Sequence, residues 1–179
     1  MPNIVFIATS LDGFIADKNG GLDWLESVHN PDGDDGGFAA FMERVDAVVM
    51  GRVTFESVVG FGVGWPYPKP GLILSSALTT APVGFEDHVR FASGTPAEIT
   101  RIARQLGYET LYIDGGATIQ NFLRDDLIDE VIITEFPLLL GDGTRLFGPL
   151  DHPMMFDLVG TATMRGQLLQ KRYRRKRSG

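Results

Sequence analysis

The chain has 179 residues and a mass of 19.6 kDa, the size of one domain whose core is large enough to fold without cross-links. It contains no cysteine, which excludes disulfides, zinc thiolate sites and thiol catalysis, and we expect no bound metal. A formal net charge of −7 argues against broad binding of nucleic acid, and the lack of a signal-peptide pattern or of an apolar run of about 18 residues predicts a cytoplasmic protein that does not enter the membrane.

Short runs rich in β-branched and aromatic residues alternate with helical patterns along the chain. The expected strands are 3–9, 47–50, 71–75, 89–92, 110–113, 130–136, 155–161 and 167–174. The expected helices are 38–45, 54–60, 96–106 and 117–124. This alternation predicts an α/β domain with a mainly parallel sheet and helices on both faces. The last two strands have no helix between them, so we expect them to be antiparallel.

The end of the chain is strongly basic. Six of the sixteen basic residues lie within 171–177, and no acidic residue follows position 170. One interpretation is a tail that binds nucleic acid. The other is a last edge strand, because lysine and arginine protect sheet edges from pairing with other chains, followed by a frayed end.

Two strand-to-helix turns have the features of phosphate sites. In "VVMGRVTFES", Gly51 allows a sharp turn, Arg52 supplies a positive charge, and Thr54 is expected to cap the next helix. In "YIDGGATIQNFL", the glycine pair 115–116 leads into a helix whose first turn contains Thr118. Free N–H groups at such helix starts attract phosphate, and glycine lets a pyrophosphate approach the backbone.

A third strand end, in "LILSS", carries Ser75 and Ser76. Each of the three turns alone also fits ordinary solvated turn chemistry. Together they would share the C-terminal edge of one parallel sheet, where α/β folds bind ligands. A dinucleotide could use one turn for its pyrophosphate and another for a 2′-phosphate, and Arg52 is suited to distinguish NADPH from NADH.

These residues resemble the dihydrofolate reductase superfamily, and most closely the reductase domain of bacterial riboflavin biosynthesis, the C-terminal domain of the bifunctional deaminase-reductase. The motifs occur in order as "IATSLDGFIA", "GGLDW", "VVMGRVTFES", "LILSS", "YIDGGATIQNFL" and "LIDEVIITEFPLLLGDGTRLF". The resemblance covers about residues 3–175. It implies a single dihydrofolate-reductase-like domain over 1–179, a three-layer α/β/α fold with a mixed, mainly parallel eight-stranded sheet and antiparallel C-terminal strands, and a homodimer.

The resemblance also implies NADPH as the cofactor and a set of residues that hold it. The adenosine end and its 2′-phosphate would contact Gly51, Arg52, Thr54, Ser75 and Ser76. The pyrophosphate would contact Gly115, Gly116, Ala117, Thr118 and Ile119. The nicotinamide carboxamide would lie beside Ala8, Ile15 and Ala16.

The leading hypothesis is hydride transfer from NADPH to a C=N or C=O carbon of a pyrimidine- or pteridine-type metabolite, resembling 5-amino-6-(5-phosphoribosylamino)uracil reductase. The candidate acids are Asp12, Asp35 and Glu56. The candidate apolar wall for the substrate consists of Trp24, Phe38 and Phe41. Asp12 fits a group that binds sugar hydroxyls and a simple turn aspartate equally well, Glu56 also fits a helix-cap partner, and the two phenylalanines also fit the core.

Two other functions of the same fold stay open. A true dihydrofolate reductase would carry a carboxylate after the loop tryptophan, and here Asp34 or Asp35 aligns with that position only through a gap. A non-catalytic protein would bind NADPH or another nucleotide without reducing a substrate. The chain has no site of the kind that holds the deaminase zinc, so the sequence predicts a reductase-like domain alone.

Overall fold

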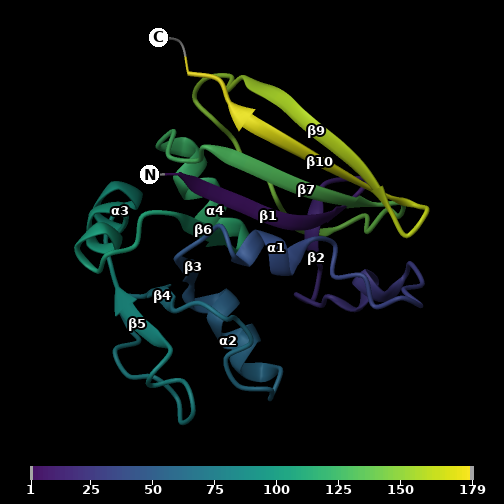
Figure 1. Ribbon diagram of the computed structural model, residues 1–179. Helices are drawn as coiled ribbons and strands as arrows, with labels where there is room; N and C mark the ends of the chain where they lie inside the picture. Colours follow the sequence, from purple (N-terminus) through teal and green to yellow (C-terminus); the bar gives the residue numbers. More distant parts are fainter. Residues whose placement is uncertain (1, 178–179) are drawn as a thin grey trace.

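An eight-stranded mixed sheet runs through the molecule with helices on both of its faces (Figure 1). The computed structural model describes residues 2–177. From one edge to the other, the strands are β5 (Val89–Ala92), β4 (Gly71–Leu74), β3 (Ala47–Gly51), β6 (Leu111–Asp114), β1 (Asn3–Ser10), β7 (Glu130–Phe136), β10 (Leu168–Arg175) and β9 (Phe156–Met164). The first six run parallel to one another, and β10 pairs antiparallel with both β7 and β9, so the predicted fold class is confirmed.

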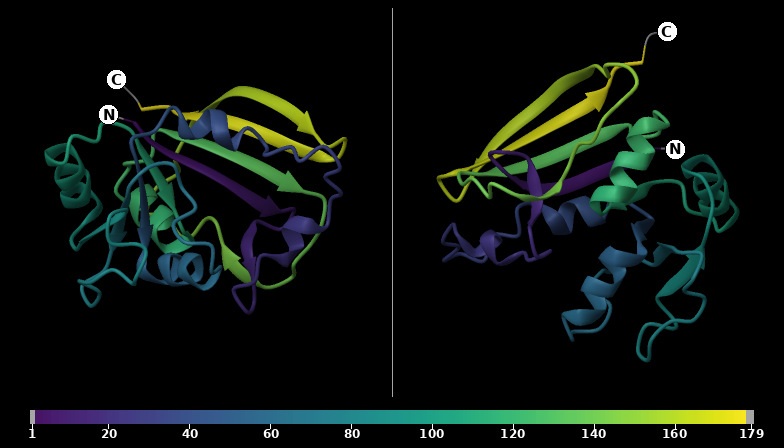
Figure 2. Two further views of the ribbon diagram at one scale, coloured as in Figure 1. Left: turned by 60° about the horizontal axis from the view of Figure 1, so that its bottom comes forward. Right: turned by 180° about the vertical axis from the view of Figure 1, so that it is seen from behind.

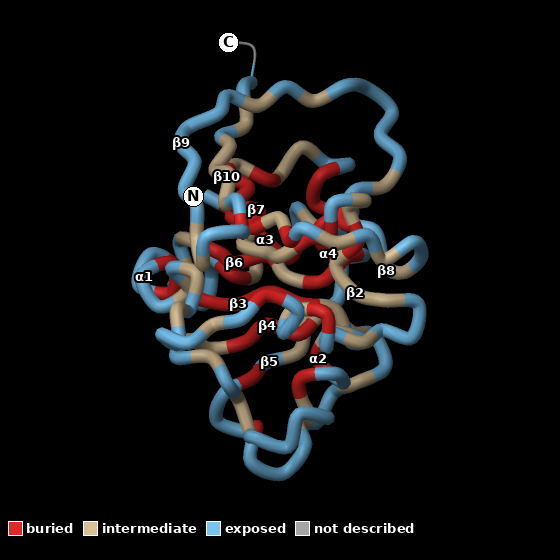
Figure 3. The backbone as a smooth tube through the Cα atoms, turned by 90° about the vertical axis from the view of Figure 1, so that its right-hand side faces the viewer, coloured by how far each residue is buried: buried red, intermediate tan, exposed pale blue. Residues whose placement is uncertain are grey.

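Two pairs of helices cover the two faces of the sheet. Helices α1 (Phe38–Met42) and α2 (Arg52–Gly60) pack against one face, and α3 (Pro96–Gln105) and α4 (Gly116–Arg124) pack against the other (Figure 2). Successive strand residues alternate between the two layers, as Val48 and Val49 do. Figure 3 shows the buried strands enclosed by exposed loops. None of the helices within residues 2–177 is long and apolar enough to cross a membrane.

The helix starts and ends are set by local chemistry. Helix α3 begins with a complete capping box, in which Thr95 and Glu98 satisfy each other's backbone N–H groups, and Pro96 occupies the first helical position. Helix α1 ends at Met42, three residues earlier than predicted, because the chain must turn before β3. There Asp46 accepts hydrogen bonds from the backbone of Glu109 and Thr110, which ties this turn to the start of β6.

Three short elements were not predicted. The strands β2 (Phe14–Asp17) and β8 (Gly143–Arg145) pair as a separate antiparallel ribbon, and a 3-10 helix, η1 (Asp23–Glu26), follows β2. The ribbon requires close backbone approach, since a Cβ at Gly143 would lie 2.0 Å from the carbonyl oxygen of Ala16. Partners so distant in sequence leave no local periodicity from which to predict them.

The basic C-terminal segment is paired with acidic residues. Glu130 lies between Arg44 and Arg172, at 2.8 Å from each, and Arg175 contacts Asp126 at 2.7 Å. Burial raises the pKa of Glu130, but the two guanidinium groups outweigh it and the net pKa is lowered. The prediction of an edge strand at 167–174 is wrong: β10 lies between β7 and β9, because the hairpin folds back and leaves β9 at the edge.

Candidate active site at the C-terminal edge of the sheet

Two helix N-termini meet at the C-terminal edge of neighbouring parallel strands. Gly51 ends β3 and precedes α2, while Gly115 follows β6 and precedes α4. A Cβ at Gly115 would lie 2.3 Å from Oγ1 of Thr54, and a Cβ at Gly51 would lie 3.1 Å from Oγ1 of Thr118. The threonine in the first turn of each helix therefore fills the space beside the other helix's glycine.

This geometry corrects the expected role of Thr54. Helix α2 begins at Arg52, two residues before the predicted start, and its N-cap is Gly51, which has no side chain to bond the helix. The N-cap of α4 is likewise a glycine, Gly115. The first N–H groups of both helices thus have no side-chain cap, which is the arrangement that binds anionic groups.

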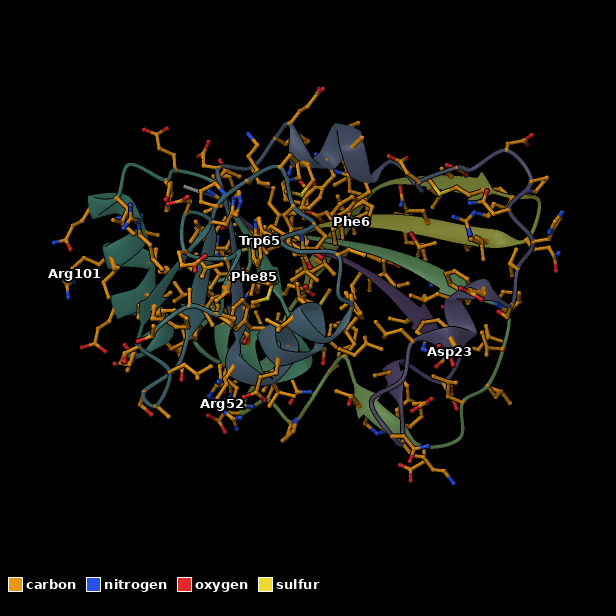
Figure 4. The ribbon with its side chains drawn as sticks, turned by 90° about the horizontal axis from the view of Figure 1, so that it is seen from below. Phe6, Asp23, Arg52, Trp65, Phe85 and Arg101 are labelled. Carbon is orange, nitrogen blue, oxygen red and sulfur yellow. The ribbon has the colours of Figure 1, made fainter. Side chains whose placement is uncertain are left out.

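Arg52 is placed at the rim of this junction (Figure 4). Its Nη1 lies 2.7 Å from Oε1 of Glu56, one turn further along α2, and about half of each side chain is exposed. An exposed i,i+4 ion pair is weak, about 0.3–0.5 kcal/mol, so a phosphate could draw the guanidinium away at little cost. The candidate acid Glu56 lies on the outer surface of α2 as the partner of Arg52.

The serines after β4 lie in a tight turn. Oγ of Ser75 accepts hydrogen bonds from the backbone N–H groups of Ala77 and Leu78, at 3.1 and 2.8 Å, while Ser76 is exposed. The hydroxyl of Ser75 keeps its own hydrogen for donation. Because β4 neighbours β3, this turn follows the strand beside Gly51 at the same edge of the sheet.

The β2–β8 ribbon contacts the second glycine turn. A Cβ at Gly116 would lie 2.8 Å from Cγ2 of Thr144 and 3.3 Å from Cδ1 of Ile15. Nε2 of Gln120 in α4 donates a hydrogen bond of 2.9 Å to the carbonyl oxygen of Arg145. Ile15, which is predicted to lie beside the nicotinamide, therefore lies at the start of α4, and Thr144 is a neighbour that the sequence analysis missed.

The other predicted cofactor residues divide between α4 and the first strands. Thr118 and Ile119 are buried in the first turns of α4, whereas Ala117 is exposed beside them. Ala16 pairs with Thr144 in the ribbon. Ala8 lies in β1 opposite Thr134 of β7 and packs against the cluster around Trp24.

Asp12 ties two loops together. Its carboxylate accepts hydrogen bonds from Oγ of Ser10 and from the backbone N–H groups of Leu140 and Gly141, at 2.5, 3.1 and 2.7 Å. The bond from Ser10, followed by those from the backbone, lowers the pKa of Asp12 to about 2. The group is therefore ionised at neutral pH, and two of its three bonds join it to a loop that neither of the two interpretations of Asp12 predicted.

We expect Asp12→Asn to weaken cofactor binding, because its amide would direct donors at backbone N–H groups and loosen the loop that leads into β8. The ordinary Asp pKa is 3.8 and the folded value about 2, so the loop contact is complete above about pH 4 and is lost only as pH falls toward 2. Titration with NADPH should show a higher Kd for the variant and the same Kd at pH 5 and 8. A Kd equal to that of the wild type would contradict this role.

The carboxylates before α1 are used in local turns. Asp35 accepts hydrogen bonds from the backbone N–H groups of Gly37 and Ala39, both at 2.8 Å, and these bonds lower its pKa. Oδ1 of Asp34 accepts a hydrogen bond from the N–H of Gly36 at 2.9 Å. Asp35 is exposed, so its position does not favour a role as a proton donor in an apolar site.

Asp114 is a second residue that the sequence analysis missed. It ends β6 directly before the glycine pair, and its Oδ1 accepts a hydrogen bond of 2.8 Å from the N–H of Gly115. The hydroxyl of Tyr67 lies 3.5 Å from its Oδ2. Burial raises the pKa of Asp114, and bonds from Gly115, Tyr67 and Tyr112 only partly oppose this. The sequence signal that could have identified Asp114 is its position between a buried strand and a glycine pair.

The aromatic residues of the predicted substrate wall fall into two places. Phe38 is half-buried, with its ring centroid 6.3 Å from that of Tyr67 and 6.4 Å from that of Tyr112. Phe41 is fully buried and stacks on Phe6, which supports the core interpretation. Phe38 thus packs against the two tyrosines that lie beside Asp114.

Trp24 lies in a separate cluster. Its ring packs edge-to-face on Phe136 at 5.3 Å, together with Val28 and Leu168. Its indole nitrogen is buried and donates no hydrogen bond to the described residues. Trp24 is therefore not part of the aromatic group beside Asp114.

Similarity to known proteins agrees with this geometry. Residues 76–169 match the family described as the RibD C-terminal domain. YwjB of Bacillus subtilis (strain 168) is 37% identical over 173 residues and covers 95% of each chain. A putative riboflavin biosynthesis protein from Shewanella sp. PV-4 is 52% identical, with a TM-score of 0.95 over 99% of this chain and 100% of that one.

The fold extends to a more distant group of enzymes. Dihydrofolate reductase from Enterococcus faecalis, in a complex with NADP(H), has a TM-score of 0.67 and 21% identity over 98% of this chain and 97% of that one. At this identity the likeness shows the fold alone. From sequence and structure together, the chain belongs to the RibD C-terminal domain family and has the fold of dihydrofolate reductase.

Proposed function

We propose that this protein is an NADPH-dependent reductase that transfers a hydride to a C=N or C=O carbon of a pyrimidine- or pteridine-type metabolite. The observation that carries the proposal is the junction of the two uncapped helix starts, where a Cβ at either Gly51 or Gly115 would press on a threonine of the other helix. The family and the name of the Shewanella relative support a reaction of the type found in riboflavin biosynthesis.

The residues at this edge fit the parts of NADPH. Backbone N–H groups at the start of α4 would hold the pyrophosphate, since this helix begins at a glycine pair and has no side-chain cap. Arg52, Ser75 and Ser76 would hold the adenosine end and its 2′-phosphate. When bound, the nicotinamide supplies the hydride.

Reduction of a C=N or C=O bond needs a proton as well as a hydride. The hydride forms a new bond to carbon, the electron pair of the double bond moves to nitrogen or oxygen, and that atom takes up a proton. We assign Asp114 as the group that holds this proton, because burial raises its pKa and favours the protonated form. Phe38 and Tyr67, which lie on the same side, would exclude water from the reacting atoms.

The assignment of Arg52 is tested by titrating the wild type and Arg52→Ala with NADPH and with NADH. A charge-assisted hydrogen bond contributes about 1.5–3 kcal/mol, so the NADPH Kd should rise roughly 10- to 150-fold. The NADH Kd should stay nearly unchanged, because NADH lacks the 2′-phosphate.

Two variants serve as controls. Arg101→Ala removes an exposed arginine on α3 and should change neither Kd. Glu56→Gln frees Arg52 from its ion pair and should keep the preference for NADPH. Equal weakening of both cofactors by Arg52→Ala would overturn the role of Arg52 in reading the phosphate.

A further inference from the structure

The segment that leads into α1 has a backbone that its own sequence leaves flexible. Gly36 and Gly37 are consecutive and both left-handed, with φ of +67 and +82. Glycine adopts these φ values readily, but it adopts many others as well, so two in succession do not hold a chain in one conformation. Residues 33–37, which we call the glycine loop, run directly into Phe38 at the start of α1. The position of Phe38 therefore depends on the contacts that fix this loop.

Hydrogen bonds within the segment shape the glycine loop without attaching it to the sheet. The side chain of Asn30 forms two bonds with the backbone of Asp34, at 3.0 and 2.8 Å. Asp35 accepts bonds from the backbone N–H groups of Gly37 and Ala39. All of these partners are four residues apart or fewer. The attachment to the rest of the molecule must come from another element.

Gln170 of β10 makes this attachment. Its Nε2 donates hydrogen bonds of 3.0 Å both to the carbonyl oxygen of Gly36 and to Oγ1 of Thr134. Thr134 lies opposite Gln170 on β7 and is buried. Because an amide nitrogen has two hydrogens to donate, these two bonds use both of them and fix the orientation of the side chain. Gln170 thus forms a bridge from the glycine loop to the sheet.

The turn of the β9–β10 hairpin holds the same loop at a second point. Nη2 of Arg165 donates a hydrogen bond of 2.5 Å to the carbonyl oxygen of Asp34. A Cβ at Gly36 would lie 3.9 Å from Sδ of Met164, so the hairpin also packs against the loop. Figure 2 (left) shows the segment before α1 passing beside the end of the hairpin. The groups that hold the loop therefore lie 131 and 134 positions further along the chain.

The glycine loop ends where the aromatic group beside Asp114 begins. Phe38 is half-buried and packs against Tyr67 and Tyr112. The hydroxyl of Tyr67 lies 3.5 Å from Oδ2 of Asp114. Tyr112 is fixed within β6, whereas Phe38 begins a five-residue helix that follows the two glycines. Phe38 is thus the member of this group whose position depends on the bridge.

We propose that Gln170 is a positioning residue for the reduction, because its amide holds the glycine loop against β7 and thereby keeps Phe38 in place beside Asp114. The kinetic part of this inference rests on the proposed function. Without the bridge, the loop takes up other conformations, and substrate binds only the fraction of molecules that have Phe38 in place. The apparent affinity falls with that fraction, while the chemistry of the bound complex is unchanged. Loss of the bridge should therefore raise KM and leave kcat nearly unchanged.

Hydrogen exchange of the backbone amides tests the attachment without any substrate. Gln170→Leu keeps a side chain of similar size but removes both donors. Amides within 33–39 should then exchange about 10-fold faster than in the wild type, since two hydrogen bonds that hold the loop are lost. The amides of β6 should exchange at the wild-type rate. Unchanged exchange within 33–39 would overturn the attachment.

Two further variants separate the attachment from a general loss of stability. Gln167→Leu is the matched control, because it makes the same change at an exposed position of the hairpin turn, and it should not alter exchange in the glycine loop. Arg165→Asn removes the second contact and places at φ +49 a residue that tolerates this conformation. It should raise exchange in the same residues as Gln170→Leu. Equal effects of Gln167→Leu and Gln170→Leu would contradict the bridge.

Steady-state kinetics with NADPH and 5-amino-6-(5-phosphoribosylamino)uracil test the effect on the site. Gln170→Leu should raise KM for this pyrimidine about 10-fold and leave kcat and the NADPH Kd within about threefold of the wild type. Phe38→Ala removes the side chain through which Gln170 acts. Adding Gln170→Leu to Phe38→Ala should therefore raise KM by less than about twofold more.

Independent effects of the two substitutions on KM, or equal rises in KM and in the NADPH Kd, would overturn the positioning role. A wild type that does not reduce the pyrimidine would count against the proposed function. In that case the exchange experiment still decides whether Gln170 holds the glycine loop, so the two failures are distinguishable.

Discussion

Under the proposed function, Asp114→Asn is expected to lower the rate of substrate reduction at least about 100-fold at neutral pH, because a positioned acid contributes roughly 10²- to 10⁴-fold. The first substrate to assay is 5-amino-6-(5-phosphoribosylamino)uracil. The amide oxygen can still accept the hydrogen bond from the N–H of Gly115, so the glycine turn and NADPH binding should be preserved. NADPH absorbance measures turnover, and a separate titration measures cofactor binding.

The pH dependence of protein stability tests this variant without any need for the substrate. Burial raises the pKa of Asp114 above 3.8, so the folded state takes up a proton that the unfolded chain has already lost. Stability should therefore fall as pH rises from about 4 through the raised pKa. Asp114→Asn should remove this fall and raise the melting temperature at pH 7, with little effect at pH 4.

Asp35→Asn is the matched control, because Asp35 is an exposed aspartate whose pKa is lowered instead. It should keep most of the turnover. Tyr67→Phe should raise the pKa of Asp114 further, since it removes a hydroxyl that favours the ionised form. If Asp114→Asn kept more than half of the activity, or if both asparagine variants lost equal amounts, Asp114 would not be the proton source.

The strands of the eight-stranded sheet and the four α-helices could be predicted from sequence because each leaves a local signal. Runs such as 47–50 and 130–136 are apolar and β-branched, and Thr95 with Glu98 marks the start of α3. The parallel order follows from the alternation of strands with helices. Parallel strands end on the same side of the sheet, so the parallel order also predicts that the two glycine turns lie at one edge.

The missed features depend on contacts between distant segments. The carboxylate of Asp12 meets Leu140 and Gly141, and nothing near residue 12 indicates those donors. Asp114 gains its raised pKa from burial beside Tyr67, which lies in an irregular loop. The edge was assigned to β10 from its charges, but those charges pair with acids such as Glu130, and pairing with β7 places β10 inside the sheet.

Gly115→Ala is expected to abolish measurable NADPH binding and to lower the melting temperature. The residue has φ +88 and ψ 136, a conformation that is essentially restricted to glycine and costs other residues about 1–3 kcal/mol. The added Cβ would also lie 2.3 Å from Oγ1 of Thr54, so the two helix starts would have to separate. Calorimetry of unfolding and NADPH titration measure the two effects.

The matched control separates backbone strain from this contact. Gly107 has a similar φ of +85, but a Cβ there would meet no atom within 4 Å. Gly107→Ala should therefore lower the melting temperature and leave the NADPH Kd unchanged. Adding Thr54→Ala to Gly115→Ala removes the colliding oxygen and should restore part of the lost stability. NADPH binding by Gly115→Ala as tight as that of Gly107→Ala would show that the junction of α2 and α4 does not hold the cofactor.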